Sequence, residues 1–185
     1  SALNLTTSLN ALGMSTESAL SVMAEYSSVI QTVGRQAFVD VNKQFMNITG
    51  SGTRLGLTLD QAADVLAEDL ELRQALGMIQ DISTNKQAKL SAQLFEQQLQ
   101  ATTILGKSID DIRGAAKQAL TDNAQVQLAI MQVTAGMDPD AAAEFTNGLQ
   151  KAAGDMAAVG IDQNIINGVM EAALAPVAFM GPAGA

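Results

Sequence analysis

The side chains that could do chemistry in this sequence are its carboxylates, because the chain contains neither histidine nor cysteine. Histidine is the commonest general base near neutral pH, and histidine and cysteine are the usual ligands of zinc and iron–sulfur clusters. Their absence excludes Ser-His-Asp and Cys-His catalytic arrangements. A reaction would therefore have to use Asp and Glu, as in a carboxylate-based hydrolase.

Two groups of acids are dense enough to consider for that role. Glu68, Asp69 and Glu71 lie close together in one predicted helix, and Asp110 and Asp111 open another. A glycosidase needs two carboxyl groups facing each other across a cleft, one of them in an apolar pocket. These acids instead fall on predicted solvent faces or in first helical turns, where they stabilise the helix N-terminus. We therefore predict no catalytic residue, no cofactor, no metal and no enzymatic activity.

The composition is acidic and predicts an aliphatic core. The 185 residues carry a net charge of −9 and are 48% hydrophobic but only 3% aromatic. A chain of this length can form one domain with a sizeable core. It lacks the basic stripe that nucleic-acid binding requires, so we expect no direct contact with nucleic acid. Its longest uncharged apolar stretch, 172–185, contains two prolines and is shorter than the ~20 residues of a transmembrane helix, so we expect no membrane span in this segment.

Apolar residues recur at helical spacing along nearly the whole chain. Between Ser15 and Ile48 they follow a spacing of three and four, which predicts one long N-terminal helix. Further helices are predicted over residues 59–79, 84–105, 109–133, 139–158 and 163–174. No segment alternates as a strand does. The sequence therefore predicts an all-α bundle of about six helices, without a sheet, in a single domain over residues 1–185.

A repeated pattern, Leu-Gly-x-(Ser/Thr)-x-acid, marks several of these helix starts. It begins at Leu12, Leu55 and Leu105, and looser versions begin at Ala135 and Val159. The glycine closes the preceding helix, and the Ser, Thr or Asp that follows accepts hydrogen bonds from free amides, contributing ~1 kcal/mol. The predicted N-caps are Ser15, Thr58, Ser108, Asp138 and Asp162. Such turns also occur in any helical protein, so the pattern alone assigns no function.

The predicted helix over 84–105 carries apolar residues on two opposite sides. A helix with two apolar faces has to be covered on both. Either it is central in its own bundle, or one side meets another subunit. From the second possibility we predict self-association through one of these sides. Its residues are Ala88, Ala92, Phe95 and Leu99.

The segments 55–66 and 103–114 resemble stretches common in tape-measure proteins of long-tailed bacteriophages. Those proteins contain many short helices that open with Leu-Gly-x-(Ser/Thr)-x-(Asp/Glu), in Ala-, Gln- and Met-rich sequence without Cys. The similarity extends over roughly residues 12–120 of a chain that starts without Met and is shorter than most members of the family. It implies a fragment or processed part of a longer virion protein that fills the tail tube, sets its length and leaves ahead of the genome.

The sequence thus leaves three functional hypotheses. The first is a non-enzymatic phage virion structural protein, tape-measure-like or an ejected tail component, that associates with copies of itself and with other virion proteins. It would reside in the phage tail or interior, and in the host cytoplasm during assembly. The alternative is a helical adaptor or chaperone-type module whose exposed Met-rich face receives a partner helix. The carboxylate-based hydrolase is third.

Overall fold

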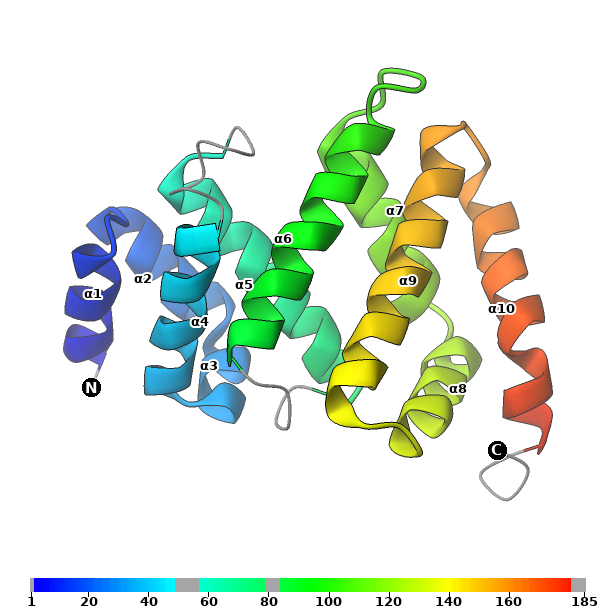
Figure 1. Ribbon diagram of the computed structural model, residues 1–185, viewed down its shortest axis with the longest axis horizontal. Helices are drawn as coiled ribbons and strands as arrows, with labels where there is room; N and C mark the ends of the chain where they lie inside the picture. Colours follow the sequence, from blue (N-terminus) through cyan, green and yellow to red (C-terminus); the bar gives the residue numbers. More distant parts are fainter. Residues whose placement is uncertain (1, 49–56, 79–83, 181–185) are drawn as a thin grey trace. The chain divides into compact units, whose positions relative to one another are not determined.

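The computed structural model describes residues 2–48, 57–78 and 84–180 (Figure 1). These residues form ten helices and no strand, so the all-α prediction is confirmed. Within these ranges, no helix combines the length and the hydropathy needed to cross a membrane. The helices are α1 (Ala2–Ala11), α2 (Thr16–Glu25), α3 (Ser27–Val33), α4 (Arg35–Ile48), α5 (Leu59–Ala75), α6 (Thr84–Ala101), α7 (Ile109–Thr121), α8 (Ala124–Ala135), α9 (Pro139–Ala158) and α10 (Gln163–Met180).

The chain divides into two compact units. That residues 1–185 form a single domain stays a prediction. Unit 1 comprises Ser1–Gln74 and Ile79–Gln93, and so contains α1 to α4, nearly all of α5 and the first part of α6. Unit 2 comprises Ala75–Met78 and Leu94–Ala185, and contains the rest of α6 and α7 to α10. Helix α6 therefore contributes residues to both units.

The predicted long N-terminal helix is wrong, because α2, α3 and α4 occupy this part of the chain. Tyr26, with φ −111° and ψ 29°, separates α2 from α3, and Gly34 separates α3 from α4. Gly34 has φ 93°, a conformation that residues with a Cβ rarely adopt. Ala19, Val41 and Phe45, which belong to the apolar spacing between Ser15 and Ile48, are nevertheless buried on either side of these breaks. The spacing therefore located the core residues, although the helix that was to carry them is interrupted.

The predicted number of about six helices was also too low. Helix α1 has low helix propensity, with Thr and Asn in its interior, but it buries Leu5 and Leu9, which lie one turn apart. The predicted helix over 109–133 is two helices, because Asn123 Oδ1 accepts a hydrogen bond from Gln125 N at 2.8 Å and caps α8. Helix α9 has the predicted bounds, whereas α10 continues beyond residue 174. The two glycines at 50 and 52, which predict the end of the helix over 15–48, lie outside the described ranges.

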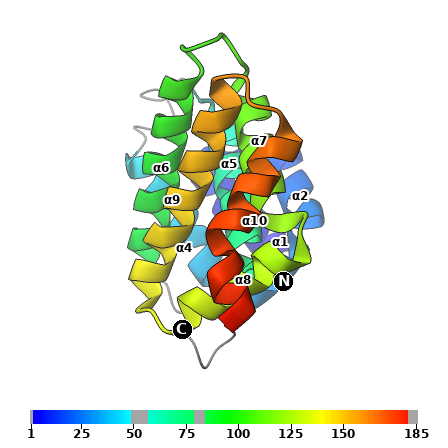
Figure 2. The same cartoon turned by 90° about the vertical axis from the view of Figure 1, so that its right-hand side faces the viewer.

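In unit 2, α7 packs against α9, and α10 packs against α7, α8 and α9. Figure 2 shows α9 and α10 side by side. Both α7 and α9 bury small residues, which are Ala116 and Ala119 of α7 and Ala142 and Ala153 of α9. Side chains of this size let helix axes approach closely, at the lower end of the usual ~8–10 Å.

Candidate functional site

The predicted interaction residues lie on α6, and the chain itself buries most of them. Ala88, Ala92 and Phe95 are buried, and Leu99 is half-buried. In unit 2, Arg113 of α7 lies over the Phe95 ring, with its guanidinium carbon 5.6 Å from the ring centroid. This arrangement favours the alternative that α6 is a central helix, and it leaves Phe95 little surface to offer a second subunit.

The predicted N-caps stand at helix starts. Ser15, Ser108 and Asp138 each accept a hydrogen bond from the amide three residues later, at 3.1, 3.1 and 3.4 Å. Asp162 accepts one from the amide two residues later at 3.4 Å, directly ahead of α10. These bonds satisfy amides that have no partner within the helix. Their role is structural, because the side-chain oxygen of each residue accepts a hydrogen bond from an amide of the helix that it caps.

Thr58 forms a reciprocal capping box with Gln61. Thr58 Oγ1 accepts from Gln61 N at 3.1 Å, and Gln61 Oε1 accepts from Thr58 N at 2.9 Å. The first half of this copy of the pattern, at residues 55 and 56, lies outside the described ranges. The box defines the start of α5 and thereby the position of every acid along that helix.

One of the acids expected on a solvent face is buried. Glu68 is exposed and Glu71 half-buried, but Asp69 is only 3% exposed. Asp69 precedes Arg73 by four residues on α5, a spacing that places both on the same side of the helix. Arg73 is itself only 1% exposed. The solvent-face prediction is therefore wrong for Asp69, because this side of α5 faces α6 rather than water.

Arg73 is the centre of a buried polar network in unit 1. Its Nη1 donates to Gln87 Oε1 and, at 3.4 Å, to Ser91 Oγ, both on α6 and both buried. A buried charge is costly unless polar groups surround it, so this network restricts how α5 and α6 can pack. Sequence reasoning missed it, because Arg73 also fits the ordinary basic residue in a last helical turn. The available signal was the spacing of Gln87 and Ser91, two polar residues on an otherwise apolar side.

Tyr26 is the one tyrosine of the chain, and it is buried among negative charges. Burial raises the pKa of its phenol above the ordinary 10, and nearby carboxylates raise it further, Glu68 most strongly. Burial also raises the pKa of Asp64, with smaller contributions from Glu25 and Asp60. A raised carboxyl pKa suits a general acid, but Asp64 is exposed on a helix surface.

Across residues 2–48, 57–78 and 84–180, no three acidic side chains gather closely enough to hold a metal ion. The carboxylates in this part of the chain therefore show no arrangement that would bind a divalent cation with three protein ligands. That the chain needs no metal or cofactor remains a prediction.

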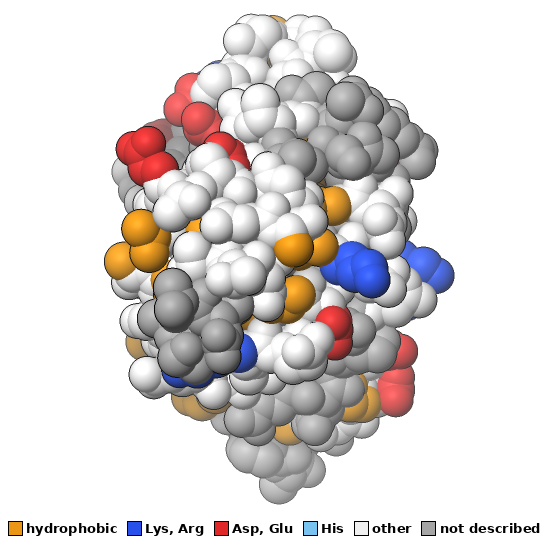
Figure 3. Space-filling model, turned by 90° about the vertical axis from the view of Figure 1, so that its left-hand side faces the viewer, with side chains coloured by type: hydrophobic (Ala, Val, Ile, Leu, Met, Phe, Trp, Pro, Cys, Tyr) orange, Lys and Arg blue, Asp and Glu red, His pale blue; other side chains and the backbone are white. Residues whose placement is uncertain are grey.

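Exposed large hydrophobic side chains are distributed unequally among the described residues. Unit 1 has one, Leu20 of α2, and on the face of unit 1 shown in Figure 3 hydrophobic atoms form small groups between polar and charged ones. The others belong to unit 2, at the α6–α7 and α9–α10 connections and on α8 and α10. They are Ile104, Leu105, Leu128, Met131, Val159, Ile165 and Val169. Single exposed hydrophobic side chains are normal on a protein surface, whereas a contiguous apolar face can bind a partner.

Comparison of the chain with models of protein families, with curated proteins and with solved structures found no match.

Proposed function

We propose that the chain is a non-enzymatic phage virion structural protein, a tape-measure-like or ejected tail component that acts through helix packing and self-association. One observation carries the proposal: the segments that resemble tape-measure sequences are also the ones that begin new helices. Thr58, in the first of these segments, caps α5, and Ser108, in the second, caps α7. A long succession of short helices, each with its own start, suits a protein whose length matters more than any one site.

The charge of the chain is compatible with a position inside a virion. A net charge of −9 disfavours adhesion to DNA that would share the same passage. The proposed locations are the phage tail or interior, and the host cytoplasm during assembly. The proposed partners are copies of the chain and other virion proteins rather than nucleic acid.

The environments of the carboxylates support a non-enzymatic role. Asp110 and Asp111 are exposed in the first turn of α7, where they stabilise the helix start. Asp69 is buried on the side of α5 that carries Arg73. Hydrolysis of a glycosidic bond instead requires two carboxyl groups that face each other across the bond.

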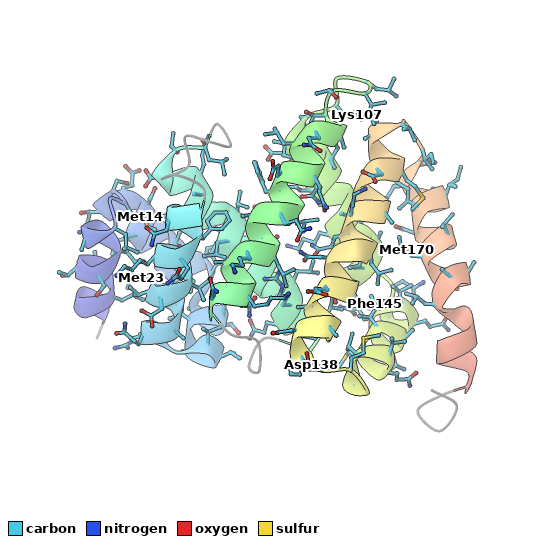
Figure 4. All side chains as sticks on the ribbon, in the orientation of Figure 1. Met14, Met23, Lys107, Asp138, Phe145 and Met170 are labelled. Carbon is cyan, nitrogen blue, oxygen red and sulfur yellow. The ribbon has the colours of Figure 1, made fainter. Side chains whose placement is uncertain are left out.

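The alternative, an adaptor with an exposed Met-rich face, has less support. Met131 is the one methionine that is exposed among the described side chains. Met14 and Met170 are buried, and Figure 4 shows Met170 on the side of α10 that faces α9. Met23 and Met78 accept hydrogen bonds at sulfur from threonines of their own unit, at 3.2 and 3.4 Å. These methionines fill the interior instead of forming a receptor surface.

The proposal is tested on particles rather than on the isolated chain. An antibody against the chain should detect it in purified phage particles, and mass spectrometry of those particles should give the length of the polypeptide that contains it. In-frame duplication of 109–158 in that polypeptide should lengthen the tails, by ~1.5 Å per added residue if the insert stays helical. Duplication of an equal number of residues in a capsid gene is the control.

Three outcomes separate the versions of the proposal. Longer tails would support a tape-measure-like protein. Tails of unchanged length, with the chain present in particles and absent from them after genome release, would support an ejected component. Absence of the chain from particles, with its full amount in the host cytoplasm, would overturn the virion assignment and favour the adaptor.

A further inference from the structure

Helix α10 is apolar on two sides, but the chain covers only one of them. Ile166, Met170 and Leu174, spaced four residues apart, are buried. They form the inner side of α10, which packs against α7, α8 and α9. Figures 1 and 2 both show the opposite side of α10 without a helix of unit 2 over it.

The exposed side is the outer face of α10, which consists of Ile165, Gly168, Val169 and Ala172. Spacings of three and four place these residues on one side of a helix. Ile165 is 59% and Val169 44% exposed. The sequence of α10 holds a single charged residue, Glu171, and Glu171 Oε2 accepts a hydrogen bond from Asn123 Nδ2 of its own unit at 3.2 Å. The outer face is therefore apolar and carries no charge.

We infer that the outer face of α10 binds the same face of a second copy of the chain, helix against antiparallel helix. The inference rests on the proposed function, of which self-association is a part, and assigns that association to a defined surface. In a two-fold symmetric contact, if residue i of one copy faces residue j of the other, then residue j of the first copy faces residue i of the second. The sequence of this face has to fit such reciprocal pairs.

The order of large and small residues fits an antiparallel pair in one register. With the two-fold axis between Gly168 and Val169, Ile165 faces Ala172 of the second copy, and Val169 faces its Gly168. Each large β-branched side chain then meets a small residue. Such complementarity lets two helix axes approach to ~8 Å. Both pairs share the same centre, so a single register satisfies the whole face.

Charge favours a second copy over other occupants. Copies with a net charge of −9 repel each other over most of their surface, but this face places no like charges together. A basic protein would find no carboxylate among these four residues, although Asp162 and Glu171 are exposed next to them. An anionic lipid surface would find no Lys or Arg in α10 to hold it. A contact made by one helix is small compared with the ~800 Å2 per partner of a standard interface, so we expect a weak, concentration-dependent dimer.

Cysteine cross-linking tests both the face and the register, because the chain has no cysteine of its own. Val169→Cys lies beside the two-fold axis, where two thiols come within disulfide reach. Ala172→Cys lies on the same face, but its two copies are offset by seven residues, ~10 Å along the helix. A disulfide needs Cα atoms within ~7 Å. Mild oxidation should therefore give several-fold more covalent dimer with Val169→Cys than with Ala172→Cys, and a mixture of Ile165→Cys and Ala172→Cys chains should give the heterodimer.

Sedimentation of the uncross-linked chain supplies an independent measurement. The unaltered chain should show a dimer fraction that grows with concentration, and Val169→Glu should remain monomeric with an unchanged helical circular dichroism spectrum. Leu20→Glu, at a similarly exposed position of unit 1, should associate as the unaltered chain does.

Several results would overturn the inference. Equal cross-linking at 169 and 172 would indicate a parallel or non-specific contact. Association that survives Val169→Glu would place it on another surface. A monomeric chain that binds neutral phosphatidylcholine vesicles through Val169 would assign the face to lipid. If the chain is present in phage tails but does not cross-link, the proposed function stands and the α10 contact is wrong. If the chain cross-links as expected but is absent from particles, the α10 contact stands and the proposed function is wrong.

Discussion

Asp60, in the first turn of α5, accepts two hydrogen bonds from Ser15, the N-cap of α2. Ser15 N donates to Oδ1 at 3.2 Å, and Ser15 Oγ donates to Oδ2 at 3.1 Å. The two residues are 45 positions apart and belong to two copies of the same helix-start pattern. The pattern that begins each helix therefore also joins two helix starts, and the carboxylate lies at the positive end of both.

This link predicts that Ser15 and Asp60 are energetically coupled. Ser15→Ala should lower the free energy of unfolding by ~1 kcal/mol through the lost cap. Asp60→Ala should lower it by a similar ~1 kcal/mol, because it removes a charge-assisted acceptor. The double variant should lose ~0.5 kcal/mol less than the sum, as expected of residues in contact. Urea unfolding followed by circular dichroism measures the cycle.

The matched control for this cycle is Ser108, which caps α7 in unit 2 in the same pattern. Ser108→Ala should destabilise the chain as Ser15→Ala does, but its effect should add to that of Asp60→Ala without coupling. Strict additivity of Ser15→Ala and Asp60→Ala would show that the two hydrogen bonds contribute nothing to stability in solution.

Two glycines of α9 should respond to alanine in opposite directions. A Cβ at Gly154 would lie 3.0 Å from Cγ2 of Ile112, a fully buried side chain, whereas nothing lies within 4 Å of a Cβ at Gly148. Gly148→Ala should stabilise the chain by ~0.5–1 kcal/mol through helix propensity. Gly154→Ala should destabilise it by ~1–3 kcal/mol, because a β-branched neighbour has to move in a close-packed contact. Thermal unfolding of both variants measures the difference, and a stabilised Gly154→Ala would show that α7 and α9 adjust freely.

Removal of the buried guanidinium should be among the most damaging single changes. Arg73→Met keeps the side-chain length but leaves Gln87 and Ser91 without their donor, and leaves Asp69 buried on the same side of α5. We expect a loss of ~3 kcal/mol, typical of breaking a buried charged network from one side. Arg73→Met combined with Gln87→Leu and Ser91→Ala should recover part of it. Lys89→Met, on the exposed side of α6, is the control and should change the free energy of unfolding little. If Arg73→Met changed it no more than Lys89→Met does, the network would be contradicted.

Tyr26 should make the chain sensitive to alkali. Burial and the surrounding carboxylates raise the pKa of its phenol in the folded state, so the folded chain holds the proton more tightly than the unfolded chain does. The stability that this contributes is complete below pH 10 and is lost as the pH rises above that value. Absorbance at 295 nm, specific because the chain has one Tyr and no Trp, should rise only together with unfolding. Tyr26→Phe should remove the alkaline loss, and titration of the native chain near pH 10 without unfolding would contradict the raised pKa.

The sequence by itself determined where several helices begin and that the chain is all-α. Ser15, Ser108 and Asp138 were recognisable as N-caps because a cap depends on residues within one helical turn of itself. Both bounds of α9 followed from Pro139 at its start and the glycine turn at its end. These interactions join residues that are close in the sequence, so they do not depend on how the rest of the chain packs.

Only the tertiary structure decided which apolar faces are covered and which polar groups are buried. Phe95 and Val169 both lie on helices with two apolar sides, yet Phe95 is buried under Arg113 whereas Val169 stays exposed. Arg73 is buried because Gln87 and Ser91 come from another helix to receive it. The physical reason is that periodicity specifies the side of a helix on which apolar residues lie, whereas burial depends on which distant segment packs against that side.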